Sequence, residues 1–447
     1  MNNASHRGYL DLCTSYMKIN SIFIGRRLGI FSQLMHSKIN YLYFITFYCV
    51  FLLPFFDSLT GAFFKLGIME EGALGSPSQL GRLVAMFLLI IYIFNSNIDN
   101  KVKKNIFYFS FYFILVEVIV AFIHVGLKPF LSGIVFFSKI LFCVLVYIYF
   151  KSWVKRDLFS YDLFFRVVII YGAILSLFLL ISFLSGFHIS NYGSKFATRG
   201  LFASGNGIGI TIGVSSLLSL YYSHISGKNL YFFLALLMIV STAIIGTKTA
   251  FLFLILSLIY LSIVSIKKFP ISSIVISIII FIFVAPILIE ALSLVFENII
   301  SKFNNIENKT VLLASSRDVF IRDAFTKLNV DGLSSLKILF GGGAFYAYES
   351  FELSSEIQRK FLENDFFELF FCYGIIPALG YLFFLVSIII NGVTKRRYFL
   401  SFCLFMIFSH SILAGHVLFN GTSSIMLVFI LLLVKSPFHP KYIRLLK

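Results

Sequence analysis

Two arginines and two carboxylates could form a site for chemistry in the second half of this chain. Arg199 stands just before an apolar run, and Arg317 lies in a long polar interval further on. Glu363 and Asp365 close that interval, where it leads into another apolar run. A guanidinium group suits phosphate oxygens with its planar fork, and a carboxylate can act as general base on a sugar hydroxyl. These residue types therefore suit an anion-binding site with a base beside it.

Arg199 and Lys248 are candidates for binding a phosphate group. Arg199 precedes Ser204 and Asn206, where a helix is predicted to begin. The N–H groups and the dipole of a helix N-terminus already favour an anion, so a neighbouring guanidinium adds to a phosphate site. Lys248 occupies a very short turn that is predicted to lie at the same face. The alternative for both residues is an interfacial cation that extends to lipid headgroups.

Arg317 and Arg322 belong to a segment with an amphipathic pattern. The apolar positions 319, 320, 321, 324, 325 and 328 suit a helix that lies on the membrane surface, with a preceding serine as its cap. Arg317 would fall in the first turn, where a cation opposes the helix dipole unless an anion is bound. Salt bridges to the neighbouring aspartates are the alternative for both arginines.

The carboxylates before the next apolar run have two interpretations. Glu363 and Asp365 could cap the helix that follows and complement its dipole, or one of them could act as a general base. His410 and His416 lie in a later apolar run, where a histidine is more often a hydrogen-bonded core residue than a catalyst. The polar residues that would support the site are Asn206, Asn364 and His416.

Two opposite charges are predicted to meet inside the bilayer. Glu117 lies eleven residues before Lys128, and Lys139 lies eleven residues after it. On two antiparallel helices joined at that point, both side chains lie about 16 Å deep at 1.5 Å per residue. A buried ion pair that fixes the helix register is one interpretation, and a proton relay is the other.

The composition that must position these residues is that of a membrane protein. Of 447 residues, 59% are hydrophobic and only 13% are charged, and the mean hydropathy is +0.93. A soluble domain is nearer half apolar and a quarter charged. Roughly twelve apolar runs are long enough to cross a bilayer. We therefore expect an all-α polytopic integral membrane helical bundle of about 12 transmembrane helices, with one large, partly helical periplasmic loop.

The basic residues predict an orientation for this bundle. They gather in alternate connections between the apolar runs, which by the positive-inside rule places both termini in the cytoplasm. The same pattern accounts for the net charge of +17 without a nucleic-acid partner. The predicted parts are a cytoplasmic segment 1–38, a bundle of about nine helices at 39–297, the periplasmic loop 298–365, about three further helices at 366–435, and a cytoplasmic tail 436–447.

Cysteine and glycine patterns predict no metal and no cofactor. The five cysteines have no CxxC spacing, and four of them lie in apolar runs, as small core residues do. The glycine triplet 341–343 lacks a P-loop lysine and dinucleotide-binding spacing, so it predicts close backbone approach or positive φ rather than a nucleotide site. The first 38 residues are polar and basic, without the apolar core of a cleavable signal.

These residues together resemble the bacterial O-antigen polymerases and, more distantly, the O-antigen ligases. The resemblance covers about residues 195–390, and the motifs that carry it, in chain order, are Arg199-Gly200…Asn206, Lys248-Thr249-Ala250, Ser316-Arg317…Phe340-Gly341-Gly342-Gly343 and Glu363-Asn364-Asp365…Tyr373-Gly374-Ile375. Glu363 stands where the ligases typically carry histidine, which favours a polymerase. Lys248 stands where arginine is common, so a bidentate phosphate contact is not expected there.

The resemblance implies a metal-independent, inverting glycosyltransferase in the bacterial inner membrane. It would join oligosaccharide repeat units carried on undecaprenyl pyrophosphate, which serve as both donor and acceptor. Arg199 and Arg317, with Lys248 and Arg322, would bind the pyrophosphate leaving group, and Glu363 or Asp365 would orient or deprotonate the acceptor hydroxyl. Membrane lipid, a flippase and a chain-length regulator are the other partners implied.

Two other functions fit part of the pattern. An O-antigen ligase would transfer finished glycan to lipid A-core. A lipid-linked oligosaccharide flippase would be a transporter, and many transporters consist of two similar halves. One large external loop late in the chain, with no early counterpart, argues against such a repeat.

Overall fold

The computed structural model describes residues 41–70, 75–123, 127–155, 161–190, 197–268, 289, 317–328, 334–346, 362 and 364–436. The chain divides into two compact units, Met1–Cys49 and Val50–Lys447. The described part of the first unit, residues 41–49, is helical. The described part of the second is helical too, and its one β-like feature is an isolated bridge between Ser190 and Thr198. The all-α class is therefore confirmed.

Eight helices in the described ranges are long and apolar enough to cross a membrane. They are Tyr41–Lys65, which contains the π-helical turn η1 (Tyr48–Leu52) and α3 (Leu53–Lys65), and α4 (Pro77–Asn95), α5 (Asn100–Ile123), α6 (Leu127–Lys155), α7 (Tyr161–Leu184), α8 (Gly205–Ser226), α10 (Lys248–Lys268) and α17 (Ile375–Thr394). Shorter apolar helices are α9 (Asn229–Ile245), α18 (Tyr398–Leu413) and α19 (Gly421–Lys435). The chain is thus a multi-pass membrane protein.

The count of about twelve spans and the orientation stay predictions. One of the roughly twelve apolar runs of the sequence, near 270–296, lies outside the described residues except for Ile289. The predicted parts 1–38 and 436–447 lie outside them as well, apart from Ser436.

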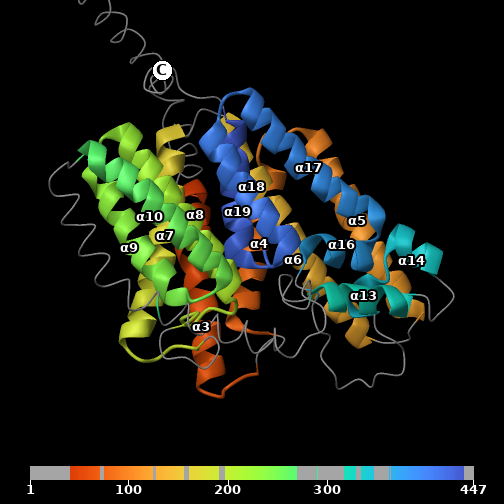
Figure 1. The fold of residues 1–447 in the computed structure, drawn as a ribbon. Helices are drawn as coiled ribbons and strands as arrows, with labels where there is room; N and C mark the ends of the chain where they lie inside the picture. The colour runs from red at the N-terminus through yellow and green to blue at the C-terminus, as the bar shows by residue number, and fades with distance from the viewer. Residues whose placement is uncertain are drawn as a thin grey trace, which may run out of the picture. The chain divides into compact units, whose positions relative to one another are not determined.

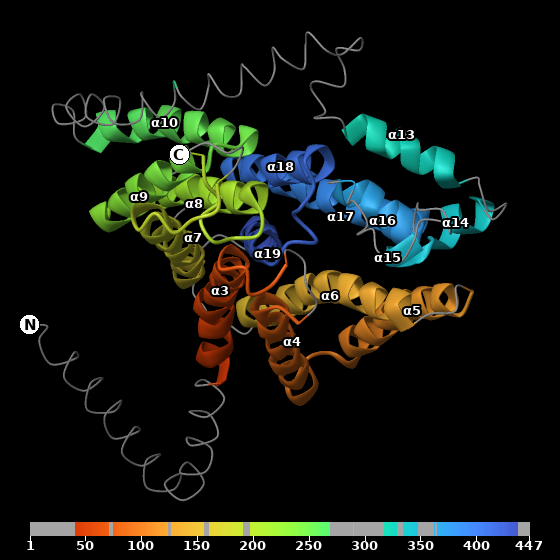
Figure 2. The same ribbon diagram turned by 90° about the horizontal axis from the view of Figure 1, so that it is seen from below.

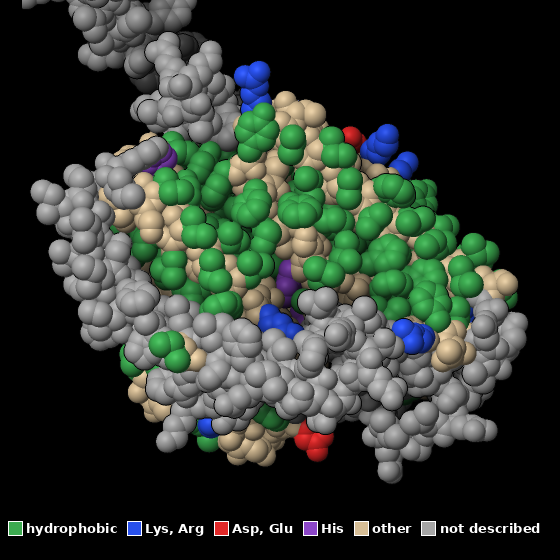
Figure 3. Space-filling model, viewed as in Figure 1, with side chains coloured by type: hydrophobic (Ala, Val, Ile, Leu, Met, Phe, Trp, Pro, Cys, Tyr) green, Lys and Arg blue, Asp and Glu red, His purple; other side chains and the backbone are tan. Residues whose placement is uncertain are grey.

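Large apolar side chains cover the outside of these helices. Phe87 of α4 is 64% exposed, Phe111 of α5 is 56% exposed and Ile181 of α7 is 63% exposed. Such surface costs about 25 cal/mol per Å² in water, but it costs nothing against lipid chains. Figure 3 shows hydrophobic side chains spread over most of the described part of one face. The described helices are therefore suited to a bundle that lipid surrounds.

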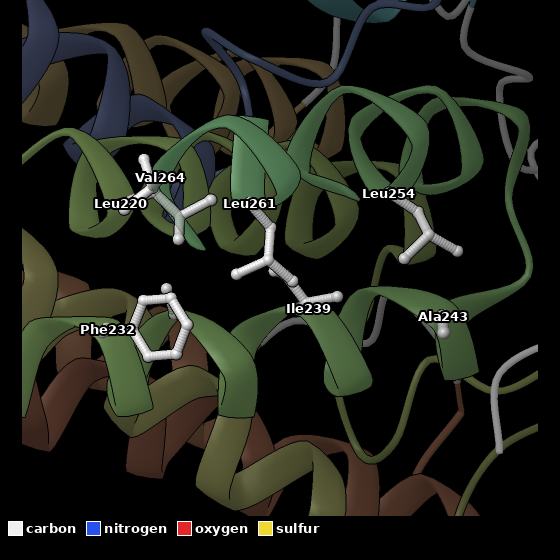
Figure 4. Close-up of a cluster of buried hydrophobic side chains, with 8 residues drawn as sticks. Leu220, Phe232, Ile239, Ala243, Leu254, Leu261 and Val264 are labelled. Atoms are coloured by element: carbon white, nitrogen blue, oxygen red, sulfur yellow. The ribbon is translucent and has the colours of Figure 1, made fainter. Parts of the chain in front are cut away.

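Helix α8 lies inside the bundle and is rich in glycine and serine. Small side chains let its neighbours approach closely. Gly172 of α7 faces Ser215, and Gly213 of α8 faces Phe253 of α10. Between α8, α9 and α10 a cluster of buried apolar side chains fills the space (Figure 4): Leu220, Phe232, Ala235, Ile239, Ala243, Leu254, Leu261 and Val264.

Replacing Gly213 by alanine is expected to destabilise this packing. An added Cβ would lie 2.6 Å from the Cγ of the buried Phe253, and such overpacking costs about 1–3 kcal/mol. Gly380→Ala in α17 is the matched control, since no described heavy atom lies within 4 Å of an added Cβ there. Alanine favours a helix over glycine by up to about 1 kcal/mol. Thermal unfolding in detergent should show a lower midpoint for Gly213→Ala alone, and equal midpoints would contradict this packing.

The first of the three helices predicted at 366–435, an apolar run over 366–391, is two helices instead of one. Helix α16 (Asp365–Tyr373) ends at Gly374, and α17 begins directly after it. Gly374 has φ 86°, a value that side chains other than glycine rarely allow. The predicted amphipathic helix is present as α13 (Arg317–Leu328), and two short helices follow it, α14 (Ser334–Phe340) and α15 (Gly343–Tyr346).

The turn between α14 and α15 packs backbone to backbone against this helix break. A Cβ on Gly374 would collide with the carbonyl of Leu339, and a Cβ on Gly341 would collide with the carbonyl of Cys372. The N–H of Gly342 donates a hydrogen bond of 2.9 Å to the carbonyl of Phe371. The glycine triplet thus shows both predicted features: a close backbone approach and, at Gly341, a positive φ of 87°. Helix α15 lies beside α5 and α6, and α14 lies beside α16 and α17 (Figure 1, Figure 2).

Candidate functional site

Asn364 fixes the start of α16. Its Oδ1 accepts a hydrogen bond of 3.1 Å from the N–H of Phe367, which is the usual N-cap contact. Its Nδ2 donates to the carbonyl of Ile412 near the end of α18. The predicted capping role at this helix start is therefore filled by Asn364, which also ties α16 to α18.

Asp365 is the first residue of α16 and is 1% exposed. Its Oδ2 accepts hydrogen bonds from Ser411 Oγ at 2.8 Å, Val417 N–H at 3.0 Å and Leu418 N–H at 2.9 Å. Burial raises the pKa of Asp365, while these three hydrogen bonds and the charge of His416 act to lower it. Asp365 is therefore a buried carboxylate that donors from the end of α18 and the turn after it hold in place.

The turn after α18 presents two consecutive N–H groups to that carboxylate. Gly415 and His416 both have positive φ, 61° and 63°. The carbonyl of His416 accepts a hydrogen bond from Ser423 Oγ of α19, which holds the turn in place. Successive N–H groups in such a conformation form an anion-binding nest. His416 thus lies in this turn beside Asp365, rather than inside a helix as the apolar run suggested.

Ser411 and Tyr381 extend the network and were not identified from the sequence. Tyr381 Oη and Ser411 Oγ are 2.8 Å apart, so a chain of polar groups runs from α17 through α18 to Asp365 of α16. Both residues lie inside apolar runs, where a single hydroxyl gives no signal. Their pairing depends on contacts between helices that are separate in sequence.

His410 joins the same end of α18 to the start of α10. His410 Nδ1 and Thr249 Oγ1 are 3.0 Å apart. Lys248, next to Thr249, is exposed at the first position of α10. The start of α10 also meets α8, because a Cβ on Gly209 would lie 3.3 Å from Thr247 Oγ1. The structure therefore places Lys248 at the end of the bundle that holds Asp365.

The N-termini of α8 and α19 meet at this end as well. Ser204 caps α8, and Asn420 caps α19 by accepting a hydrogen bond of 3.0 Å from Thr422 N–H. A Cβ on Gly207 would lie 2.6 Å from Asn420 Nδ2, so the two first turns touch. Asn206 is half-buried in the first turn of α8. Each N-terminus carries roughly half a positive charge, so the region favours an anion.

Arg199 lies in the loop that leads into α8. Its N–H donates a hydrogen bond of 3.1 Å to the carbonyl of Ile189, and its Nη1 donates one of 2.6 Å to the carbonyl of Ala203. Gly61 of α3 leaves no room for a Cβ against the carbonyl of Leu201, so the loop is packed closely on α3. The guanidinium of Arg199 is therefore held beside the first turn of α8.

Arg82 is a further cation at the start of α19. Its Nη2 lies 3.1 Å from Asp57 Oδ1, and its Nε lies 2.6 Å from the position of a Cβ on Gly421. In the sequence Arg82 marks only the start of an apolar run, because nothing there pairs it with α19. Folding brings it to the same group of helix N-termini.

The structure describes the side chains of only some of the remaining predicted site residues. The side chains of Arg317 and Glu363 lie outside the described residues. Arg322 is exposed on α13. Helix α13 packs on α16 through Phe325, whose ring centroid lies 5.0 Å from that of Phe371. The predicted arginine helix thus lies beside the helix that begins with Asp365.

Glu117 has a contact that the sequence did not reveal. It is 1% exposed, and its Oε1 accepts a hydrogen bond of 3.0 Å from the N–H of Ala344 in the first turn of α15. Lys139 Nζ lies 5.7 Å from the ring centroid of Phe136. The ion pair between Glu117 and Lys139 stays a prediction. The described contact makes Glu117 a link between α5 and the segment before α16.

Within the described ranges, no group of three or more His, Cys, Asp or Glu side chains is arranged to hold a metal ion. The four described cysteines are free and buried, as core residues: Cys49, Cys143, Cys372 and Cys403. No family model, curated protein or solved structure matches this chain. An assignment of function therefore rests on the residues and their geometry.

Proposed function

We propose that this chain polymerises oligosaccharide repeat units carried on undecaprenyl pyrophosphate into O-antigen or a related surface polysaccharide. The reaction would take place at the periplasmic face of the bacterial inner membrane, with both termini of the chain in the cytoplasm. The observation that supports it best is the placement of Asp365, a buried carboxylate at the end of the bundle where the helix N-termini of α8, α10 and α19 gather. A carboxylate beside an anion-binding region suits glycosyl transfer from a pyrophosphate.

The proposed reaction is one displacement at an anomeric carbon. The acceptor hydroxyl attacks this carbon from the face opposite the leaving group, so the new glycosidic bond has inverted configuration. The bond from the carbon to the pyrophosphate oxygen breaks, and the lipid pyrophosphate leaves with the electron pair. Asp365, or Glu363 two residues before it, takes the proton of the hydroxyl. In this proposal cationic side chains, rather than a metal ion, offset the charge of the leaving group.

Four cations are assigned to that leaving group: Arg199, Lys248, Arg317 and Arg322. Fixed charges aimed at a developing anion stabilise a transition state more than a ground state. Arg199 is supported by its position before α8, and Lys248 is supported by its position at the start of α10. Arg317 and Arg322 belong to α13, which packs on α16.

Complementation of a host without its O-antigen polymerase tests this proposal. The wild-type chain should restore a ladder of surface glycan on a gel. Arg199→Ala, Arg317→Ala and Lys248→Ala should each reduce polymer about 100-fold, the usual effect of removing one preorganised charge, and leave a single repeat on lipid A. Lys228→Ala is the matched control for Lys248→Ala, since Lys228 is exposed just before α9, away from Asp365. Membrane levels of every variant are measured alongside.

Two results would redirect the assignment. An unchanged ladder in all three variants would show that these cations are not the pyrophosphate site. A deletion of this gene alone that leaves every lipid A bare of repeats would favour an O-antigen ligase or a flippase. The helix break at Gly374 is the observation that favours the flippase, because discontinuous helices are frequent at the substrate sites of transporters.

A further inference from the structure

Helix α14 displays large apolar side chains although it lies outside all the candidate spans. Four of its seven residues are Leu336, Ile338, Leu339 and Phe340, which are 55%, 38%, 45% and 50% exposed. A contiguous apolar surface of this kind is unfavourable in water and marks a place where another apolar phase or molecule binds. The sequence pattern assigns this segment to an aqueous loop, so its surface requires an explanation.

The next helix, α15, contacts α5 at positions that lie inside α5, some way before its C-terminal end. A Cβ on Gly343 would lie 3.0 Å from Val120 Cγ1 and 3.1 Å from Glu117 Oε2. Val120 and Glu117 come three and six residues before Ile123, the last residue of α5. At 1.5 Å per residue they lie about 5 and 9 Å along the helix from that end. The segment that contains α15 therefore lies alongside α5, rather than beyond the C-terminal end of α5.

The backbone between α14 and α15 meets the requirement for entering a membrane. Irregular backbone at membrane depth is tolerated where the protein itself supplies hydrogen-bond partners. Gly341 N–H donates a hydrogen bond of 2.8 Å to the carbonyl of Lys337, and Gly342 N–H donates one of 2.9 Å to the carbonyl of Phe371. Gly342 is also buried. Both N–H groups of this turn are thus satisfied without water.

The exposed surface of α14 continues onto a candidate membrane span. Leu339 touches the helix break at Gly374, and two residues further Ile376 of α17 is 65% exposed. Helix α17 is one of the eight helices able to cross a membrane. Exposed apolar side chains therefore lie on both sides of the backbone contact between Gly374 and Leu339.

We propose that residues 334–346 form a re-entrant element that inserts into the bilayer beside α5 and α16, with the exposed side chains of α14 against lipid acyl chains. Bilayer hydrocarbon, rather than water or a protein, covers this surface in the proposal, because α14 packs against α17, a candidate membrane span. This inference does not depend on the glycosyl transfer proposed above.

Tryptophan fluorescence in lipid vesicles tests the proposal. The chain has one tryptophan, the buried Trp153, and the parent protein gives its constant background. Phe340→Trp and Leu336→Trp, each in the full chain, are reconstituted in dioleoylphosphatidylcholine with and without brominated acyl chains. Phe111→Trp, on the exposed face of α5, is the lipid reference, and Glu70→Trp, exposed outside the candidate spans, is the aqueous reference.

The emission that the new tryptophan adds to the parent background should, in both α14 variants, be quenched by brominated lipid as strongly as the emission added in Phe111→Trp. Quenching no stronger than that of Glu70→Trp, together with strong quenching by acrylamide in the buffer, would overturn the proposal. Phe340→Trp retains an aromatic side chain at an exposed position, so the fold should tolerate it. A single symmetric elution peak before reconstitution confirms that each variant is folded.

Discussion

Gly374→Ala should leave little folded protein in the membrane. A Cβ at this position would lie 2.8 Å from the backbone nitrogen of Phe340 and still closer to the carbonyl of Leu339. Backbone atoms cannot rotate aside as the end of a side chain can. With φ 86° and ψ 178°, Gly374 lies in a backbone region essentially restricted to glycine, so a residue with a Cβ adds about 1–3 kcal/mol of conformational strain. Strain and overpacking together should cost about 2–6 kcal/mol, a large part of the stability of an ordinary domain.

Gly341→Ala should have a similar effect, because the contact is reciprocal. Its Cβ would collide with the carbonyl of Cys372, at the other side of the same helix break. Gly227→Ala is the matched control, because Gly227 also has positive φ, 73°, but no described heavy atom lies within 4 Å of its added Cβ. The control therefore carries the conformational strain alone.

These effects are measured as the amount of membrane-inserted protein and as the midpoint of its thermal unfolding in detergent. Gly227→Ala should lower the midpoint by a few degrees, whereas Gly341→Ala and Gly374→Ala should lower it much further or prevent accumulation. If all three variants behave alike, the close backbone approach between the two segments is wrong and only strain at positive φ matters.

Asp365→Asn should be present in the membrane but should make about 100-fold less polymer, the loss expected for a missing general base. Asparagine keeps an acceptor oxygen for Ser411 Oγ and for the two N–H groups of the turn after α18. The substitution therefore removes the charge and the proton acceptor while it leaves most of the hydrogen bonds. The glycan ladder in the complementation assay, normalised to protein level, gives the result.

Asp365→Ala separates the structural role from the chemical one. It leaves three buried donors without their acceptor, and each such loss costs about 1–3 kcal/mol. Its membrane level should therefore fall well below that of Asp365→Asn. A full ladder from Asp365→Asn would show that Asp365 only holds the turn, and the base would then be Glu363, for which Glu363→Gln should abolish polymer.

Local patterns in the sequence predicted most of the fold. Helix placement follows from apolar runs that need no partner to be recognised, and the described spans lie where those runs were found. Asn364 and Asp365 were correctly assigned to a helix start, because capping depends on neighbours in the sequence. The glycine triplet likewise signalled a close backbone approach.

Long-range contacts could not be predicted in this way. The break at Gly374 falls inside one continuous apolar run, and a backbone contact with Leu339 from a separate segment accompanies it. Ser411 and Tyr381 gain their importance only when α17 and α18 pack against α16. Arg82 is brought to the start of α19 by folding alone. Pairings of this kind are decided by packing between elements rather than by local pattern.

The backbone contact between the glycine turn and the helix break also sets an order for biogenesis. Gly342 leaves the ribosome before Phe371, the residue whose carbonyl its N–H requires. At roughly 5–20 residues per second, the partner is synthesised a few seconds later at most. Docking of residues 334–346 on α16 must therefore follow the synthesis of α16, so it is a late step in the assembly of the chain.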